Sequence, residues 1–200
     1  LGCLLYLSGL FTMQNPLFCE AKYHAYLKNE GWTLNAIAGV LGNMQHESSI
    51  NPGRWEGDDV GDGPGYGLVQ WTPYSKYTDW APLNGYSDPS EMDGNLARIV
   101  YEFTHNVQYY PTEAYPESRS EFTTSTNSAY YLACAFAFNY ERSWVALYGT
   151  EEEKEALRQK RGNSAIYWYE YLGGTTPITP TTKKKKGYKF VLFNKRRRIY

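Results

Sequence analysis

The sequence predicts an α+β domain that is mostly helical, with one small β-hairpin inserted after its second helix. Long segments place apolar residues at helical spacing, residues 53 to 80 are rich in glycine, and "GYGLVQWT" in that region contains β-favouring residues. The 200 residues, 42% of them hydrophobic, are enough for one packed domain. Residues 13–172 are expected to form it.

The first two helices are predicted from about Asn15 to Asn29 and from Thr33 onward. Gly31 ends the first, and Thr33 can cap the second. Apolar residues of the second follow helical spacing at Leu34, Ile37, Val40, Leu41 and Met44. The turn residues Asn51-Pro52-Gly53 require this helix to end soon after Glu47.

Three further helices are expected downstream of the glycine-rich region. "SEMDGNLARIVYEFTHN" places its apolar residues on one face. "NSAYYLACAFAFNYER" is apolar almost all round, so it is predicted to be the central buried helix. A final amphipathic helix is expected from about Glu151 to Tyr171, followed by the linker-like "TTPITPTT".

The two ends of the chain differ from the body. Residues 1–12 form an apolar extension that is shorter than the ~20 residues of a membrane span and lacks a basic signal-peptide start. A fragment, a true start at Met13 and a truncated signal or lipoprotein segment all remain open. We expect no membrane span.

Residues 173–200 are interpreted as a linker and a basic tail. The tail holds nine of the 20 Lys and Arg residues, which leaves 11 in residues 1–182 against all 21 Asp and Glu. That body therefore carries about −10, which argues against specific nucleic-acid binding. The tail itself is either a solvated terminus or the start of a missing segment, or else an electrostatic contact with anionic polymers, nucleic acid or a partner protein.

The sequence lacks the residues that several common catalytic mechanisms require. "HESSI" begins like the zinc-protease motif, but Ile50 stands where the second histidine is required. There is no G-x-S-x-G motif, and three cysteines cannot form a closed set of disulfides. Cys134 lies in an apolar run and is interpreted as a small core residue. No metal or organic cofactor is expected.

Glu47 is the strongest candidate for a catalytic residue. It falls at the edge of the apolar stripe of the second helix, near that helix's C-terminal end, so partial burial and the helix dipole should raise its pKa. Such an acid suits protonation of a glycosidic oxygen. The alternative is an exposed glutamate in a surface ion pair. Tyr66, Gln70 and Trp71 in the glycine-rich region could form the opposite wall of a sugar-binding cleft.

Three segments, "GVLGNMQHESSINPGRWE", "GYGLVQWTPYSKYTDWA" and "FNYERSW", together resemble the phage tail lysozyme family over roughly residues 20 to 171. The resemblance implies a lysozyme-like fold and cleavage of the β-1,4 bond between N-acetylmuramic acid and N-acetylglucosamine. It implies Glu47 as the catalytic acid and Gln70 as a residue that lines the cleft. Tyr140 and Glu141 match the family's third segment, and Tyr140 is expected to contact substrate.

The same resemblance implies a protein of the virion, located in the phage tail, that is made in the host cytoplasm and acts on the bacterial cell wall. Its expected partners are bacterial peptidoglycan and other phage tail proteins. The outcome expected is local degradation of the wall during infection.

A second catalytic carboxylate is harder to place, although glycosidases normally use two. The candidates in the glycine-rich loop are Glu56, Asp58, Asp59 and Asp62. If none acts, Glu47 could serve alone as acid and then base, as in a lytic transglycosylase. A cell-wall-binding tail module without turnover is the further alternative.

Overall fold

A computed structural model describes the protein at residues 16–58 and 63–175. The predicted N-terminal extension and basic tail lie outside these residues, and so does part of the glycine-rich loop. In chain order the elements are α1 (Pro16–Asn29), α2 (Leu34–Glu47), η1 (Glu56–Asp58), α3 (Ser75–Thr78), α4 (Trp80–Leu83), α5 (Met92–Thr104), α6 (Arg119–Thr124), α7 (Ala129–Phe136), η2 (Ala137–Glu141), α8 (Trp144–Tyr148) and α9 (Glu151–Tyr171).

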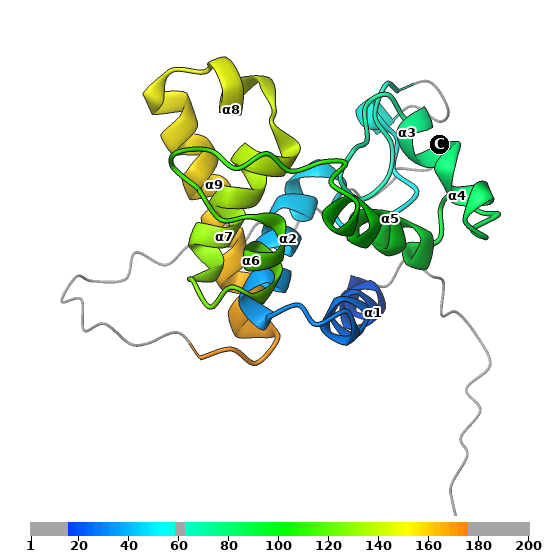
Figure 1. Ribbon diagram of the computed structural model, residues 1–200, viewed down its shortest axis with the longest axis horizontal. Coiled ribbons are helices and arrows are strands. Elements are labelled where there is room, and N and C mark those ends of the chain that lie inside the picture. The colour runs from blue at the N-terminus through cyan, green and yellow to red at the C-terminus, as the bar shows by residue number, and fades with distance from the viewer. Residues whose placement is uncertain (1–15, 59–62, 176–200) are drawn as a thin grey trace, which may run out of the picture.

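Helix α2 is the centre of the fold. It is buried without a break from Ala36 to Met44, and Figure 1 shows α7, α8 and α9 on one side of it and α3, α4 and α5 on the other. Thr33 caps it as predicted, because its hydroxyl accepts from the backbone amide of Ala36 at 3.2 Å. Helix α7, predicted to be the central buried helix, is largely buried as expected, but the longest buried stretch belongs to α2.

Two glycines explain how three helices pack so closely at α2. A Cβ on Gly39 would lie 3.0 Å from the backbone nitrogen of Ala133 on α7. A Cβ on Gly42 would lie 2.7 Å from the backbone oxygen of Arg161 and the backbone nitrogen of Ala165, both on α9. A larger residue at either position would push a neighbouring helix away from α2. The sequence G-V-L-G thus brings Arg161 next to the C-terminal half of α2.

Helix α7 does not continue regularly through "AFNYE". Residues Ala137–Glu141 form a turn of π-helix, and Arg142 then takes a left-handed conformation that ends it. Ser143 starts the next helix by accepting from the amide of Ala146 at 3.3 Å. π-helical turns are frequent at functional sites. Here the turn directs Tyr140 and Glu141 toward the glycine-rich segment.

The predicted β-hairpin is not confirmed. Within residues 16–58 and 63–175 the structure contains no β-strand, and "GYGLVQW" is instead a tight turn. Isolated bridges join Tyr66 to Trp55 and to Trp71, with amide-to-oxygen distances of 3.2 and 2.9 Å between Tyr66 and Trp71. Gly67 and Gln70 have positive φ angles of 84° and 52°, which bend the chain before a strand can extend.

Helix length and composition also bear on membrane association. No helix in the described part of the chain is both long enough and apolar enough to cross a bilayer.

Candidate active site

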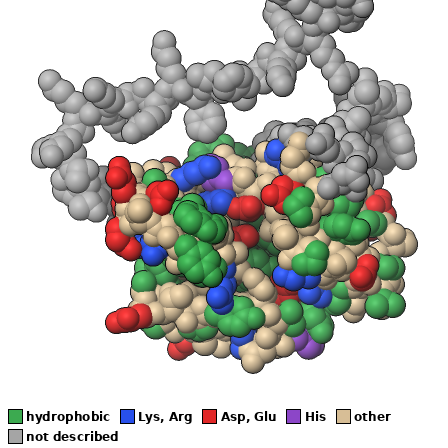
Figure 2. All heavy atoms as spheres, turned by 90° about the horizontal axis from the view of Figure 1, so that it is seen from above, with side chains coloured by type: hydrophobic (Ala, Val, Ile, Leu, Met, Phe, Trp, Pro, Cys, Tyr) green, Lys and Arg blue, Asp and Glu red, His purple; other side chains and the backbone are tan. Residues whose placement is uncertain are grey.

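The cleft that contains Glu47 is lined by residues of α2, η2 and α8 and by the glycine-rich segment. Its volume is about 570 Å³. From above, Figure 2 shows a hollow with acidic, basic and hydrophobic side chains around it, and the cavity lining has the same mixture. The lining residues are Glu47, Arg54, Glu56, Gly57, Val69, Gln70, Thr72, Glu141, Ser143 and Trp144. Such a polar cleft with a few aromatic and apolar groups suits a hydroxyl-rich ligand.

Glu47 is the last residue of α2, and its side chain is 21% exposed. The position predicted from helical spacing is confirmed: the carboxylate lies at the margin of the core and opens into the cleft. The sequence did not predict that the guanidinium of Arg161 forms an ion pair with this carboxylate.

Arg161 is the site residue that the sequence did not indicate. It is buried, and its Nη1 donates to the backbone oxygen of Asn43 at 2.8 Å, which fixes it against α2. It stands 114 residues from Glu47, in a helix otherwise rich in surface charge. The only available signal was its spacing to Ala165 and Trp168, which places all three on the buried face of α9.

Glu141 is a further carboxyl group that lines the cleft. It ends the π-helical turn and lines the same cavity as Glu47. Its Oε1 atom is buried and has no hydrogen-bond partner among the described residues. Burial, followed by the negative charge of Glu47, raises the pKa of Glu141 well above its usual range, although Arg161 acts in the opposite direction.

Gln70, in the glycine-rich segment, lines the same cavity as Glu47. Its Nε2 donates to the backbone oxygens of Gly67 at 2.8 Å and Arg54 at 3.1 Å, so the side chain also holds the turn together. The segment is fastened to helices on both sides. Ser48 donates to the backbone oxygen of Leu68 at 2.9 Å, and the amide of Leu68 donates to Asn95 at 3.0 Å.

The aromatic residues predicted to line the cleft lie mostly in the core instead. Tyr66, Trp71 and Tyr140 are 4%, 5% and 2% exposed, so their rings belong mainly to the core. Trp71 stacks on Tyr77 with ring centroids 4.6 Å apart. Trp71 and Tyr140 reach the edge of a second cavity of about 380 Å³, which shares Val69, Gln70, Thr72 and Glu141 with the larger cleft.

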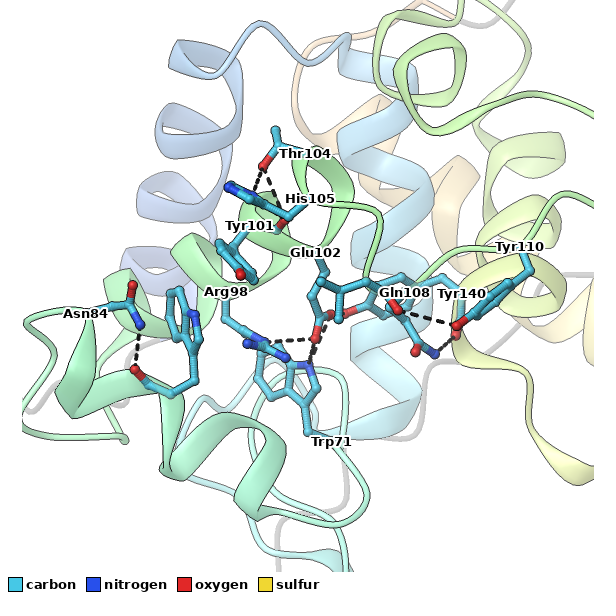
Figure 3. Close-up of polar contacts among 12 residues, drawn as sticks. Trp71, Asn84, Arg98, Tyr101, Glu102, Thr104, His105, Gln108, Tyr110 and Tyr140 are labelled. Atoms are coloured by element: carbon cyan, nitrogen blue, oxygen red, sulfur yellow. Dashed lines mark hydrogen bonds and ion pairs between the residues drawn. The ribbon is translucent and has the colours of Figure 1, made fainter.

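Glu102 of α5 connects Trp71 of the glycine-rich segment to Tyr140 of η2, as Figure 3 shows. It is buried and forms an ion pair with Arg98 at 2.8 Å. The indole nitrogen of Trp71 donates to both of its oxygens at 3.1 and 3.2 Å, and the hydroxyl of Tyr140 donates to Oε2. Nothing in the sequence indicated this residue, because one glutamate in an amphipathic helix gives no sign that it points inward.

The exposed aromatic group at the cleft is Trp144, which the sequence analysis also missed. It begins α8 directly after the turn at Arg142 and Ser143, and 66% of its surface is exposed although it lines the cavity. An indole face at the edge of a polar cleft is a suitable surface for stacking a sugar ring.

Of the four acidic residues proposed from the loop, the structure describes the surroundings of one. Glu56 is exposed and lines the same cleft as Glu47 and Glu141. Asp58 is described only as the last residue of η1, and Asp59 and Asp62 lie outside the described residues. No group of three or more potential metal ligands occurs within the described ranges.

His46 and Cys134 have structural surroundings. His46 Nε2 lies 2.9 Å from the hydroxyl of Ser164 on α9, and burial together with Arg161 and Lys160 lowers its pKa to about 4. Cys134 is a buried core residue, as predicted, and burial raises the pKa of its thiol to about 11. Such a thiol is a poor nucleophile at neutral pH.

Comparison with known proteins identifies the family. The family model for phage tail lysozyme matches residues 20–172. Morphogenesis protein 1 of Bacillus phage B103 is 40% identical over 171 residues, which cover 84% of this chain and 43% of that protein. The chain thus spans less than half the length of this relative. On this evidence, the chain belongs to the phage tail lysozyme family.

Proposed function

We propose that the domain is a peptidoglycan hydrolase that cleaves the β-1,4 bond between N-acetylmuramic acid and N-acetylglucosamine, with Glu47 as the general acid. The observation that carries the proposal is the position of Glu47, half-buried at the end of α2, in a polar cleft between two sides of the fold. Membership of the phage tail lysozyme family supports the choice of substrate.

The other cleft residues have separate roles in this proposal. Trp144 stacks on a sugar ring, and Gln70 contacts the glycan from the opposite wall. Tyr66, Trp71 and Tyr140 support that wall from the core, and Glu102 holds Trp71 and Tyr140 in place. Precise support of this kind matters because small displacements of a catalytic group reduce the rate strongly.

The proposed biological setting is a phage tail, where the domain would open the bacterial wall locally during infection. The support is the family and the relative from a Bacillus phage. Other tail proteins would be its partners in the virion.

The test is mass spectrometry of the products released from purified peptidoglycan by the full chain and by its Glu47→Gln variant. We expect reducing muramic ends from the wild-type protein and none from the variant. Glu113→Gln is a matched control, since Glu113 is exposed and lines neither cavity. Full activity of Glu47→Gln would refute the assignment of the acid.

Two other products would change the proposed reaction. Anhydro-muramic ends would identify a lytic transglycosylase that uses the same acid. Binding to the wall without any glycan cleavage, by a protein whose circular dichroism shows it folded, would identify a non-catalytic wall-binding module.

A further inference from the structure

Two carboxyl groups and one buried guanidinium meet beside the cleft, where α2, η2 and α9 come together. Glu47 and Glu141 line the same cavity, and Arg161 contacts Glu47 from the core. Arg161 has one further donor bonded to the backbone oxygen of Asn43, and its Nε atom has no partner in the described structure. Arg161 is therefore bound to Glu47 and to α2, and no ion pair joins it to Glu141 among the described residues.

Other charged and titratable groups surround Glu141 on every element packed against it. They are Glu47 on α2, Arg161 on α9, Glu102 and Arg98 on α5, Tyr140 on η2, Tyr23 on α1, Arg142 next to it in sequence, and Arg54, Glu56 and Lys76 across the two cavities. Arg98 is paired with Glu102, so it is not available to balance a charge on Glu141.

This arrangement holds one negative charge more easily than two. If both carboxyl groups were ionised, two negative charges would lie near Arg161, which is already paired with Glu47. The Oε1 atom of Glu141 is buried without a hydrogen bond, and such an atom costs far more free energy in a charged carboxylate than in a neutral carboxyl group. The pKa of Glu141, which is raised by burial and by the charge of Glu47, is in the direction that this reasoning requires.

We propose that Glu141 is a positioning residue that keeps a proton in the cleft: Glu47 and Glu141 share one proton, and Arg161 balances the single negative charge that remains. The inference rests on the proposed role of Glu47 as the acid. It explains how a glutamate paired with an arginine can still protonate a leaving group. It assigns the carboxyl group that acts with Glu47 to η2 rather than to Glu56, which lines the same cleft.

The proton that Glu47 and Glu141 supply to the reaction is returned to them before the reaction ends. Glu47 gives its proton to the glycosidic oxygen as the bond from that oxygen to the muramic anomeric carbon breaks. The pair then carries two negative charges, one of which Arg161 balances. The attacking hydroxyl group, from water or from the sugar itself, releases a proton as it bonds to the anomeric carbon. That proton returns to the pair, and no other reactant is needed.

The first test is the dependence of kcat/KM on pH for the full chain and for Glu141→Gln, with Glu113→Gln as the control. In the variant Glu47 has no partner with which to share the proton. We expect the alkaline limb of the profile to move to lower pH by one unit or more, while activity at acidic pH is largely retained. The control should follow the wild-type profile. An unchanged profile, or an equal loss at every pH, would overturn the proposal.

A second test does not depend on turnover. Carbon NMR of protein labelled at the glutamate carboxyl groups can follow the titration of Glu141, assigned through its absence in Glu141→Gln. We expect its midpoint to fall in Glu47→Gln, because the neighbouring negative charge is gone. A midpoint that does not move would refute the shared proton. If the pair is observed but the wild-type protein cleaves no glycan, the proposed function fails and the pairing stands.

Discussion

Replacement of Glu102 tests whether the buried carboxylate holds the cleft together. In Glu102→Gln the amide keeps the shape of the side chain, but the charged partner of Arg98 is lost. A hydrogen bond to a charged group contributes about 1.5–3 kcal/mol. Three donors bind Glu102, and they come from Arg98, Trp71 and Tyr140. We therefore expect the free energy of unfolding to fall by about 2–3 kcal/mol.

Glu102→Ala should be worse, since it leaves Arg98 buried without a partner at a cost of about 3–5 kcal/mol. The matched control is Asp93→Asn on the same helix. Asp93 pairs with Lys22 at 2.8 Å, but the two side chains are 43% and 40% exposed. An exposed pair of this kind contributes only about 0.2–1 kcal/mol.

The assay is urea unfolding followed by circular dichroism, together with the melting temperature. For a chain of this size 1 kcal/mol corresponds to roughly 2–4 °C. Glu102→Gln should thus melt about 4–12 °C below the wild type and Asp93→Asn within about 4 °C of it. If the two variants lost the same stability, the ion pair of Glu102 would have no special structural role and the reasoning would be refuted.

Two further predictions concern the cleft edge and α2. Trp144→Ala should raise KM roughly 2- to 10-fold, equivalent to about 0.5–1.5 kcal/mol of stacking, with kcat little changed. The control is Tyr167→Ala, which removes an exposed aromatic residue outside both cavities and should leave KM unchanged. Equal effects of the two substitutions on KM would contradict stacking of a sugar ring on Trp144. His46 is held neutral in the fold, with its pKa lowered to about 4, so the unfolded chain binds more protons between pH 6.5 and 4. As the pH is lowered from 6.5 to 4, the free energy of unfolding should therefore decrease by roughly 1–2 kcal/mol, after allowance for partial exposure. In urea titrations His46→Gln should remove this decrease, whereas substitution of the exposed His105 by Gln should leave it in place.

The helices were largely predictable because their signals are local. The cap at Thr33, the spacing of apolar residues and the turn at Asn51-Pro52-Gly53 set the bounds of α2. The bounds predicted for α9, Glu151 and Tyr171, are those observed. The hairpin was predicted from β-favouring residues in "GYGLVQWT", but the left-handed backbone at Gly67 and Gln70 turns the chain too soon for a strand.

The aromatic residues show a second limit of local patterns. The sequence predicted that Tyr66, Trp71 and Tyr140 line the cleft, yet it could not separate aromatic side chains that are exposed there from those that fill the core. Trp71 and Tyr140 are buried because a carboxylate 31 residues from one and 38 from the other accepts their polar hydrogens. Trp144 is exposed because a left-handed turn and a cap start a new helix there. Neither cause is visible in the spacing of aromatic residues.

The position of Glu47 was predictable and its chemistry was not, for the same physical reason. Helical spacing fixes which side of α2 a residue occupies, but the groups opposite it come from other parts of the chain. Arg161 reaches Glu47 because Gly42 allows α9 to approach α2, and Glu141 reaches the same cleft through a π-helical turn. A glutamate at the end of a helix is common. One that shares its cleft with Glu141 and forms an ion pair with a buried arginine is not, and no local spacing in the sequence predicts that environment.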